Sequence, residues 1–342
     1  MKTSTISSLS ISNAMQLTVQ NAQKEMVQLQ QEAVSGTYYD VGVSLGVNTS
    51  QSLNFSRESD RLKALIDANA LAEQRMDTSQ LAMTQMSKSA QNVLNTFVSV
   101  TSSSDSTSNT VAANTAKAEL EAFVGYANTT VNGEFVFSGI NTDAQPLAST
   151  FVDDVTADFN TQLSTYLSAN SIASVSDMSA TDMQTFLNGY TSTFDWSSWT
   201  NASDTEMSSR ISTTETVKTS TSLNDDGFKN FVMAAVIGSQ LGASSLDNAT
   251  RAAVTSTVTS LAGAGVSGVD SSRSQLGLSQ SRVENANTSM DAQKTIIDTQ
   301  LTNLIGIDKY AASTRLTTLL TQVETSYKIT SRIQNLSLVN YL

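Results

Sequence analysis

The chain has 342 residues and a net charge of −12, and it contains neither cysteine nor histidine. The missing residue types exclude disulfides, thiolate nucleophiles, imidazole acid–base catalysis and zinc sites of the usual ligand types, so we expect no catalytic residues, no cofactor and no metal site. The acidic balance argues against binding to nucleic acid or to anionic membranes, and we expect no segment to be long and apolar enough to span a bilayer.

The N-terminal region predicts a helix that pairs with another helix. Residues 1–12 are rich in Ser and Thr and lack the apolar run and cleavage site of a secretory signal peptide. The hydrophobic seam that follows steps alternately by three and four residues, which is typical of a helix docked along a partner. Gly36 is expected to end this helix, because glycine adopts the left-handed C-cap conformation at little cost. The seam consists of Met15, Val19, Ala22, Met26, Leu29 and Ala33.

A connector and a long helix are expected next. Residues 37–52 contain two glycines and predict a flexible connector. Residues 42–46 spell the nucleophile elbow of hydrolases, but that serine needs a histidine base, which this chain lacks. A three-four seam between residues 62 and 100 predicts a rod on the order of 60 Å, although the core face of an ordinary bundle is equally compatible. Asn69 and Ser79 interrupt its apolar line, and such polar positions commonly fix helix register.

The middle of the chain differs from its ends in residue composition and in hydrophobic periodicity. Residues 101–110 predict a loop and residues 111–127 a shorter helix. Asn132-Gly133 lies between two short runs with a period of two, which is the strongest short-range signal for a β-hairpin. Residues 147–226 contain short elements rich in Asp, Ser and Thr, and we expect a smaller inserted α/β or β domain there.

Two further patterns invite a functional interpretation. Residues 263–268 spell the glycine fingerprint of a dinucleotide-binding loop, but the preceding segment reads as helix and no strand–helix alternation surrounds it. We therefore expect a turn between helices. The acidic pairs Asp153-Asp154 and Asp225-Asp226 lack the ligand spacing of a calcium loop, and we interpret them as solvated turns.

The C-terminal region predicts the partner of the first helix. A last helical tract is expected from about Gln275, with a break at Gly306. Two adjacent stripes with three-four spacing run along its end, and either stripe fits a helix docked against another. One stripe consists of Ala312, Leu316, Leu320, Val323 and Tyr327, and the other of Leu319, Ser326, Ile329, Ile333 and Leu336.

Pairing of the two chain ends makes the middle an insertion. The predicted fold is mainly α, a long antiparallel helical bundle or coiled coil with a β-hairpin and a smaller inserted domain. We expect three domains. Residues 1–40 with 305–342 form a terminal coiled coil, residues 41–146 with 227–304 form a helical rod that carries the hairpin, and residues 147–226 form the inserted outer domain.

One helix pair is only marginally stable by itself. Five or six buried apolar side chains per helix contribute at most ~1.5–3 kcal/mol each, whereas ordering costs ~1–2 kcal/mol for every backbone residue. We therefore expect the terminal helices to be mobile in a free subunit and to become ordered when neighbouring subunits add hydrophobic contacts. The residues expected at this assembly interface are Met15, Val19, Ala22, Met26, Leu29, Leu316, Leu320, Val323, Tyr327, Ile333 and Leu336.

Several segments resemble a known family, the flagellin-like axial proteins of the bacterial flagellum. Residues 24–36, KEMVQLQQEAVSG, resemble the family's N-terminal helix, and residues 306–311, GIDKYA, resemble part of its C-terminal region. Residues 127–139 and the closing residues 336–342, LSLVNYL, are similar to the hairpin and the chain end of members that join hook to filament. Residues 37–40 depart from the pattern, because the family usually has a basic residue and an Asp-Asp-Pro-like turn there.

The resemblance implies a structural role in the flagellum and no enzymatic activity. It implies an extracellular location at the hook–filament junction, reached by flagellar type III export without a cleaved signal peptide. The partners it implies are further copies of the chain in a ring, a hook-side hook-associated protein, flagellin, and an export chaperone on the C-terminal helix. Neither nucleic acid nor membrane is among them. In this arrangement the paired termini form an inner tube and residues 147–226 face outward.

Three alternatives stay open at this point. Flagellin, the filament subunit itself, belongs to the same class and differs in abundance and in its chain ending. A secreted enzyme or adhesin on a flagellin-like scaffold would need its activity in residues 147–226. A generic cytoplasmic coiled-coil scaffold would stay soluble and functional without its C-terminal helix.

Overall fold

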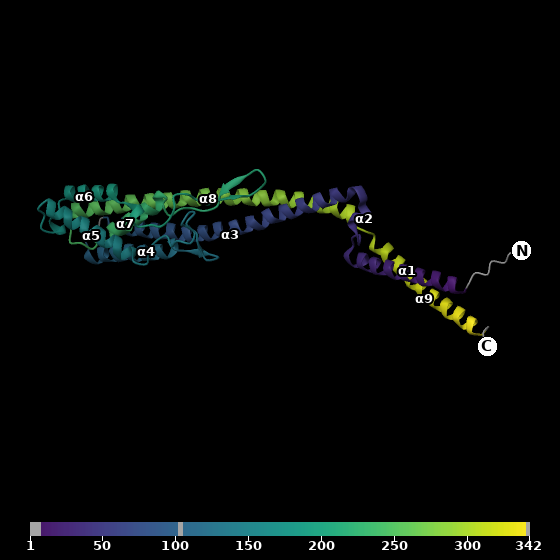
Figure 1. Cartoon of the computed structure of the whole chain (residues 1–342). Helices are drawn as coiled ribbons and strands as arrows, with labels where there is room; N and C mark the ends of the chain where they lie inside the picture. Colours follow the sequence, from purple (N-terminus) through teal and green to yellow (C-terminus); the bar gives the residue numbers. More distant parts are fainter. Residues whose placement is uncertain (1–7, 102–104, 340–342) are drawn as a thin grey trace. The chain divides into compact units, whose positions relative to one another are not determined.

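The structure is a computed structural model that describes residues 8–101 and 105–339, and it confirms the predicted fold class (Figure 1). Contacts divide the chain into two compact units, Met1–Ala64 with Asp291–Leu342 and Leu65–Met290. The three-domain division expected from the sequence stays a prediction. The helices are α1 (Ser8–Ser35), α2 (Val41–Leu45), α3 (Thr49–Val100), α4 (Ser106–Ala127), α5 (Phe151–Ala169), α6 (Ala180–Thr193), α7 (Asp226–Leu241), α8 (Asn248–Ile305) and α9 (Lys309–Val339).

Short strands and 3₁₀ turns complete the secondary structure. Two antiparallel hairpins are present in the described residues, one formed by β1 and β2 and the other by β3 and β4. Their strands are β1 (Thr130–Val131), β2 (Glu134–Phe135), β3 (Ser208–Arg210) and β4 (Thr216–Lys218), and the 3₁₀ turns are η1 (Gly46–Asn48), η2 (Val175–Asp177) and η3 (Trp196–Ser198).

The first helix ends where the sequence predicted, but the connector is shorter than expected. Gly36 has a φ of +80° directly after the last residue of α1, as a left-handed C-cap requires. The prediction of a flexible connector over residues 37–52 is wrong, because α2 and η1 occupy part of it and α3 already begins at Thr49. Asp40 starts α2 by accepting a hydrogen bond from the Val43 amide at 2.9 Å, a capping signal that the two glycines obscured.

In the unit formed by Leu65–Met290, α3 and α8 are joined along a seam that includes buried polar residues. Asn69 of α3 is 1% exposed and donates from Nδ2 to the Ile211 carbonyl at 2.8 Å and to Asn287 Oδ1 of α8 at 2.7 Å. A buried amide that is bonded on both sides permits only one alignment, because any slip leaves its polar atoms unpaired. The hydrogen bond from Asn69 to the Ile211 carbonyl also fastens the tip of the β3–β4 hairpin to α3.

The glycine-rich residues 263–268 lie inside α8, so the predicted turn between helices is wrong. These glycines permit a close approach of α7. A Cβ on Gly268 would lie 2.4 Å from the Gly227 Cα, and a Cβ on Gly265 would lie 3.1 Å from the Phe231 backbone nitrogen. Glycine is therefore placed where two helix backbones meet, and α8 continues without a break as far as Ile305.

The core of this unit surrounds α7, whose residues from Phe231 to Ile237 are buried on all sides. Phe123 of α4 packs on Phe231 with ring centroids 5.1 Å apart. Gly238 of α7 lies against Phe97 of α3, where a Cβ would come within 2.8 Å of the ring. The segment after residue 226 is therefore an apolar helix that packs between α3, α4 and α8.

The Asn-Gly hairpin forms as predicted and is fastened to α3. Asn132 and Gly133 both have positive φ, +52° and +86°, as a type I′ turn requires. Arg75, which is 6% exposed, donates to Glu134 Oε2 at 2.8 Å and to the Phe135 carbonyl. The buried guanidinium thus holds the second strand of the hairpin through both a side chain and the backbone.

By length and composition alone, one 18-residue stretch of α8 is apolar enough to span a membrane, although the sequence analysis expected no such segment. Its mean hydropathy over 18 residues is 1.2, and 33% of the stretch is buried within the protein. Core helices pass the same criterion of length and composition. Val254, Val258, Ala262 and Val269 of α8 are each at most 1% exposed, so its apolar residues serve the protein core.

An unpaired hydroxyl lies in the aromatic cluster between α5 and α6. The Tyr190 side chain is 1% exposed and packs edge-on against Phe159 at 4.9 Å, and its hydroxyl has no hydrogen-bond partner among the residues that the structure describes. Burial and the nearby Asp158 raise the pKa of this hydroxyl, so it stays neutral. We expect Tyr190→Phe to leave the free energy of unfolding unchanged or to raise it by up to about 1 kcal/mol, because an unpaired buried hydroxyl is removed. Thermal unfolding checks this, and a clear loss of stability would reveal a hydroxyl partner.

Candidate assembly interface

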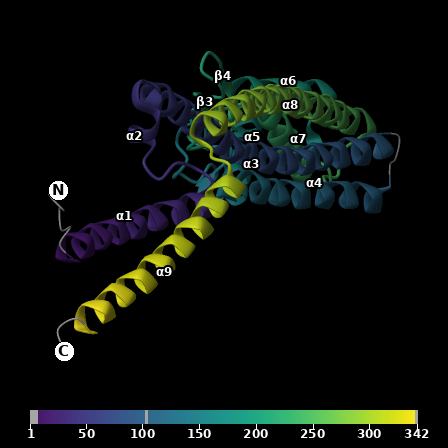
Figure 2. The same cartoon turned by 90° about the vertical axis from the view of Figure 1, so that its right-hand side faces the viewer.

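The two ends of the described chain form an antiparallel helix pair. Figures 1 and 2 show α1 and α9 side by side, with the start of α1 and the end of α9 at the same end of the pair. Glu25 pairs with Arg315 at 3.1 Å, and Gln23 Nε2 donates to the Tyr327 hydroxyl at 3.2 Å. Polar bonds at the rim therefore fix the alignment of two helices whose sequence positions differ by about three hundred residues.

Most of the predicted seam lies between α1 and α9 but is only partly buried there. Ala22 is 6% exposed and Leu319 is 2% exposed, so these two residues mark the centre of the pair. The half-buried residues of the seam are Met15, Val19, Met26, Leu29 and Ala33 on α1 and Leu316 and Val323 on α9. A seam that is mostly half-buried in a single chain has room for further apolar contacts.

Each of the two predicted stripes of α9 is partly covered by α1 and partly exposed. Leu319 of the second stripe faces α1 together with Ala312, Leu316 and Val323 of the first, and Ser326 is half-buried. The remaining described members point to solvent, and they are Leu320 (46% exposed), Tyr327 (54%) and Ile329 (40%). The side chains of the predicted interface residues Ile333 and Leu336 lie outside the described part of the chain.

On the face of α9 turned away from α1, a row of threonines lines an open groove. Each hydroxyl donates to the carbonyl four residues earlier in the same helix, at 2.8 to 3.1 Å. The donors are thereby satisfied inside the helix, and methyl groups line the surface. The groove is lined by Thr314, Thr317, Thr318, Thr321, Gln322, Thr325, Ser326 and Ile329.

The outer face of α1 is also partly apolar. Leu17 is 59% exposed, Val27 61% and Val34 79%. Their spacing places them on the side of α1 that does not meet α9. Both helices of the pair therefore carry apolar atoms on faces that no part of the described chain covers, which is the pattern of a surface completed by another molecule.

Two backbone hydrogen bonds, here called the clasp, join the residues that follow α1 to the residues between α8 and α9. The Tyr38 amide donates to the Ile305 carbonyl and the Ile307 amide donates to the Gly36 carbonyl, both at 3.0 Å. The expected break at Gly306 is confirmed, because α8 ends at Ile305 and α9 begins at Lys309. The two breaks face each other and form a one-residue antiparallel bridge between Thr37 and Gly306.

The sequence reasoning missed the residues that cap this clasp. Asp308 accepts from the amides of Tyr310 at 2.8 Å and Ala311 at 3.2 Å and so starts α9. Lys309 extends toward the Val34 carbonyl, at 3.4 Å, near the C-terminal end of α1. An Asp directly before a helical pattern is an ordinary N-cap signal and could have identified Asp308. The contact of Lys309 depends on tertiary placement and has no local signal.

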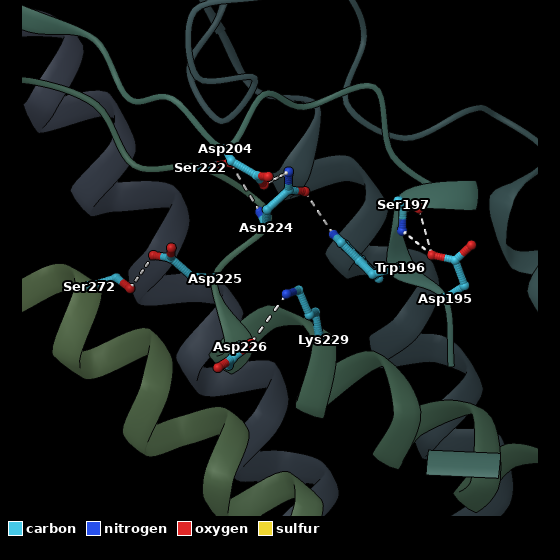
Figure 3. A network of polar contacts seen from close by, with 10 residues as sticks. All are labelled: Asp195, Trp196, Ser197, Asp204, Ser222, Asn224, Asp225, Asp226, Lys229 and Ser272. Atoms are coloured by element: carbon cyan, nitrogen blue, oxygen red, sulfur yellow. Dashed lines mark hydrogen bonds and ion pairs between the residues drawn. The ribbon is translucent and has the colours of Figure 1, made fainter. Parts of the chain in front are cut away.

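A polar network fastens the end of residues 147–226 to the helical body (Figure 3). Asn224 accepts a hydrogen bond from Trp196 Nε1 at 3.0 Å and donates to Asp204 Oδ1 at 2.6 Å. The next residue, Asp225, accepts from Ser272 Oγ of α8 at 2.7 Å. The interpretation of this acidic pair as a solvated turn is therefore wrong for its first member, which is fastened to α8, while Asp226 is exposed.

Asp225 makes the stability of this junction dependent on pH. Burial raises the pKa of its carboxyl group above the usual 3.8, and the charges of Glu206 and Asp226 add to the effect, although the Ser272 hydrogen bond opposes it. The folded state therefore binds a proton more tightly than the unfolded state, and stability falls as pH rises from 3.8 through the raised pKa.

We expect Asp225→Asn to raise the midpoint of thermal unfolding at pH 7 relative to the unmodified chain. An amide oxygen still accepts from Ser272, but the partly buried charge is gone. The difference should vanish below about pH 3.8, where the carboxyl group is protonated in both states. Unfolding curves across this range check the sign, and a variant that is less stable at pH 7 would show that the charge stabilises the junction.

No group of three or more acidic side chains within residues 8–101 and 105–339 is arranged to hold a metal ion. Asp153 and Asp154, the other pair singled out in the sequence, lie exposed in the first turn of α5. There they complement the positive end of the helix dipole. The arrangement with the clearest functional character in the described chain is thus the incomplete apolar surface of α1 and α9.

Comparisons with known proteins agree with this arrangement. The family model for the bacterial flagellin N-terminal helical region matches residues 6–142, and that for the bacterial flagellin C-terminal helical region matches residues 259–342. The structure is similar to a solved structure from Vibrio parahaemolyticus described as a flagellar hook-associated protein. The TM-score is 0.54 at 10% identity, over 75% of this chain and 97% of that chain, a likeness that shows the fold. No curated protein matches the sequence significantly.

Proposed function

Because this chain belongs to the flagellin family of bacterial flagellar axial proteins, we propose that it is the junction subunit between hook and filament, of the hook-associated protein 3 type. Family membership makes it a structural protein of the flagellum, outside the cell. The junction role within that family rests on the hairpin ending Phe135-Val136-Phe137-Ser138-Gly139 and on the chain ending LSLVNYL. The description of the Vibrio parahaemolyticus protein agrees with it.

The observation that carries the assembly part of the proposal is the half-buried seam between α1 and α9. A seam that a single chain leaves partly open is completed when neighbouring copies supply further apolar walls. A contact between different faces of neighbouring copies generates a ring if the rotation closes. In the proposal, the outer faces of α1 and α9 make this contact.

The proposed partners follow from a junction role. On one side the ring meets a hook-side hook-associated protein, and on the other it meets flagellin. Before export, a dedicated chaperone covers the amphipathic C-terminal helix, whose apolar side chains Leu320 and Ile329 are otherwise exposed. Export through the flagellar type III apparatus, with no cleaved signal peptide, completes the proposal.

Deletion of the gene tests the junction role. We expect cells to lose swimming and to release filament subunits into the medium, because the filament has no platform. Complementation with the unmodified gene should restore both properties. If a deletion strain swims and releases no filament subunit, the junction role is wrong.

A filament subunit is the second candidate, because both flagellin family models match the chain. The two roles differ in copy number. Quantitative mass spectrometry of purified flagella distinguishes them, since a junction subunit is present in a small fixed number per flagellum and a filament subunit dominates the preparation.

A further inference from the structure

The entire net charge of the chain resides in one stretch of sequence. Residues 118–209 contain twelve acidic residues and no lysine or arginine, whereas the rest of the chain contains nineteen acidic and nineteen basic residues. The net charge of −12 is therefore confined to this stretch, which extends from α4 through the β1–β2 hairpin and α5 and α6 to β3. All of it belongs to the unit formed by Leu65–Met290.

Few of these carboxylates are neutralised by a neighbour. The basic partners come from outside the stretch, where Lys117 lies 3.9 Å from Glu121, Arg75 lies 2.8 Å from Glu134, and Lys218 contacts Glu206. The other acidic residues are held by neutral groups or point to solvent. Those with exposed side chains include Asp153, Asp154, Asp177, Asp195 and Asp204.

Such a one-sided charge distribution is not required by the fold. The long helices α3 and α8 carry both signs of charge along their lengths, with local pairs such as Arg273 with Asp270 and Lys294 with Asp298. A surface of one sign produces a field that extends about 10 Å at 0.1 M salt and about 30 Å at 0.01 M. The stretch therefore acts on any second copy that approaches it.

We infer that residues 118–209 form a self-repelling surface that makes assembly of this chain dependent on ionic strength. The inference rests on the proposed self-association. In a ring every copy has the same orientation relative to its neighbour, so equivalent acidic surfaces recur around it. Each copy carries the same excess of negative charge, so the acidic stretches of neighbouring copies repel one another, and dissolved salt screens the repulsion. The apolar seams of α1 and α9 hold the copies together while the acidic surfaces keep the rest of each copy separate.

Two variants of equal net charge test the inference. Asp143→Asn/Asp153→Asn/Asp154→Asn removes three charges from the acidic stretch, and none of these side chains makes a hydrogen bond or ion pair in the described structure. The control, Asp60→Asn/Glu284→Gln/Asp291→Asn, removes three exposed charges from the long helices. Both variants carry a net charge of −9, so any difference between them reports where the charge lies and not how large it is.

Sedimentation and static light scattering of the full chain provide two readouts. At ~10 mM salt we expect the association constant of the first variant to exceed that of the control by roughly two- to fivefold, and the two to converge in ~1 M salt, where the screening length falls to about 3 Å. At concentrations where the chain is monomeric, the second virial coefficient should be smaller for the first variant than for the control.

The outcomes separate the inference from the proposed function. Equal behaviour of the two variants in both readouts at low salt would overturn the inference. A difference in the virial coefficient without self-association at any salt concentration would support the repelling surface and contradict the proposed ring. Self-association that is independent of salt in the unmodified chain would overturn the inference and leave the ring intact.

Discussion

Gly268→Ala is expected to destabilise the unit formed by Leu65–Met290 by about 3 kcal/mol or more. The added Cβ would lie 2.4 Å from the Gly227 Cα and 2.8 Å from the Gly227 nitrogen. Both atoms belong to the backbone of α7, and α7 is enclosed by apolar side chains, so it cannot move aside without opening the core. The gain in helix propensity from replacing glycine, about 1 kcal/mol, is too small to compensate.

Gly263→Ala is the matched control, because it introduces the same change five residues earlier in the same helix. A Cβ at position 263 meets no atom within 4 Å. This variant should be more stable than the unmodified chain by up to about 1 kcal/mol. Chemical denaturation of both variants gives the two signs. If Gly268→Ala is also stabilising, α7 and α8 do not approach each other as closely as described, and the explanation for the glycines in α8 fails.

Leu319→Asp is expected to separate α1 from α9, whereas Leu320→Asp leaves them paired. Leu319 is 2% exposed at the centre of the pair and Leu320 is 46% exposed on its outer side. An unpaired carboxylate at the first position costs several kcal/mol, which exceeds what a marginal helix pair can tolerate. At the second position the carboxylate stays in water in the free chain and disturbs only a contact with another copy.

The absence of cysteine permits a direct measurement of this pairing. Gln23 Nε2 and the Tyr327 hydroxyl, at the tips of two long side chains, lie 3.2 Å apart across the pair, so a short bismaleimide should cross-link the two thiols of Gln23→Cys/Tyr327→Cys in the otherwise unmodified chain. We expect this cross-link to persist with Leu320→Asp and to disappear with Leu319→Asp. Both substitutions should abolish self-association. Assembly that survives Leu320→Asp would place the contact between copies elsewhere on the chain.

The sequence predicted the features that short-range chemistry determines. Gly36 ends α1 with a positive φ, and Asn132-Gly133 forms the turn of a hairpin, because few other residues tolerate these conformations. The three-four seams identified which segments pair. The short helix α2 was missed because its N-cap, Asp40, precedes glycines that also fit a connector.

Tertiary contacts decided what the local patterns could not. The glycines of residues 263–268 suggest a turn when read locally, but the approach of Gly227 gives them a reason to lie within a helix. Likewise both stripes of α9 have valid helical spacing, and only the position of α1 selects Leu319 over Leu320 as the buried residue. Spacing identifies a helix that docks, whereas the partner determines which of two adjacent stripes is covered.

Hydrogen exchange of the free and the assembled chain tests the central claim most directly. The claim is that the pair of α1 and α9 is left incomplete by one chain and is completed by its neighbours. We predict fast amide exchange over residues 8–35 and 309–339 in the free chain and strong protection of both segments after assembly, with α7 protected in both states. Strong protection of both segments in the free chain, or no gain of protection on assembly, would contradict the account.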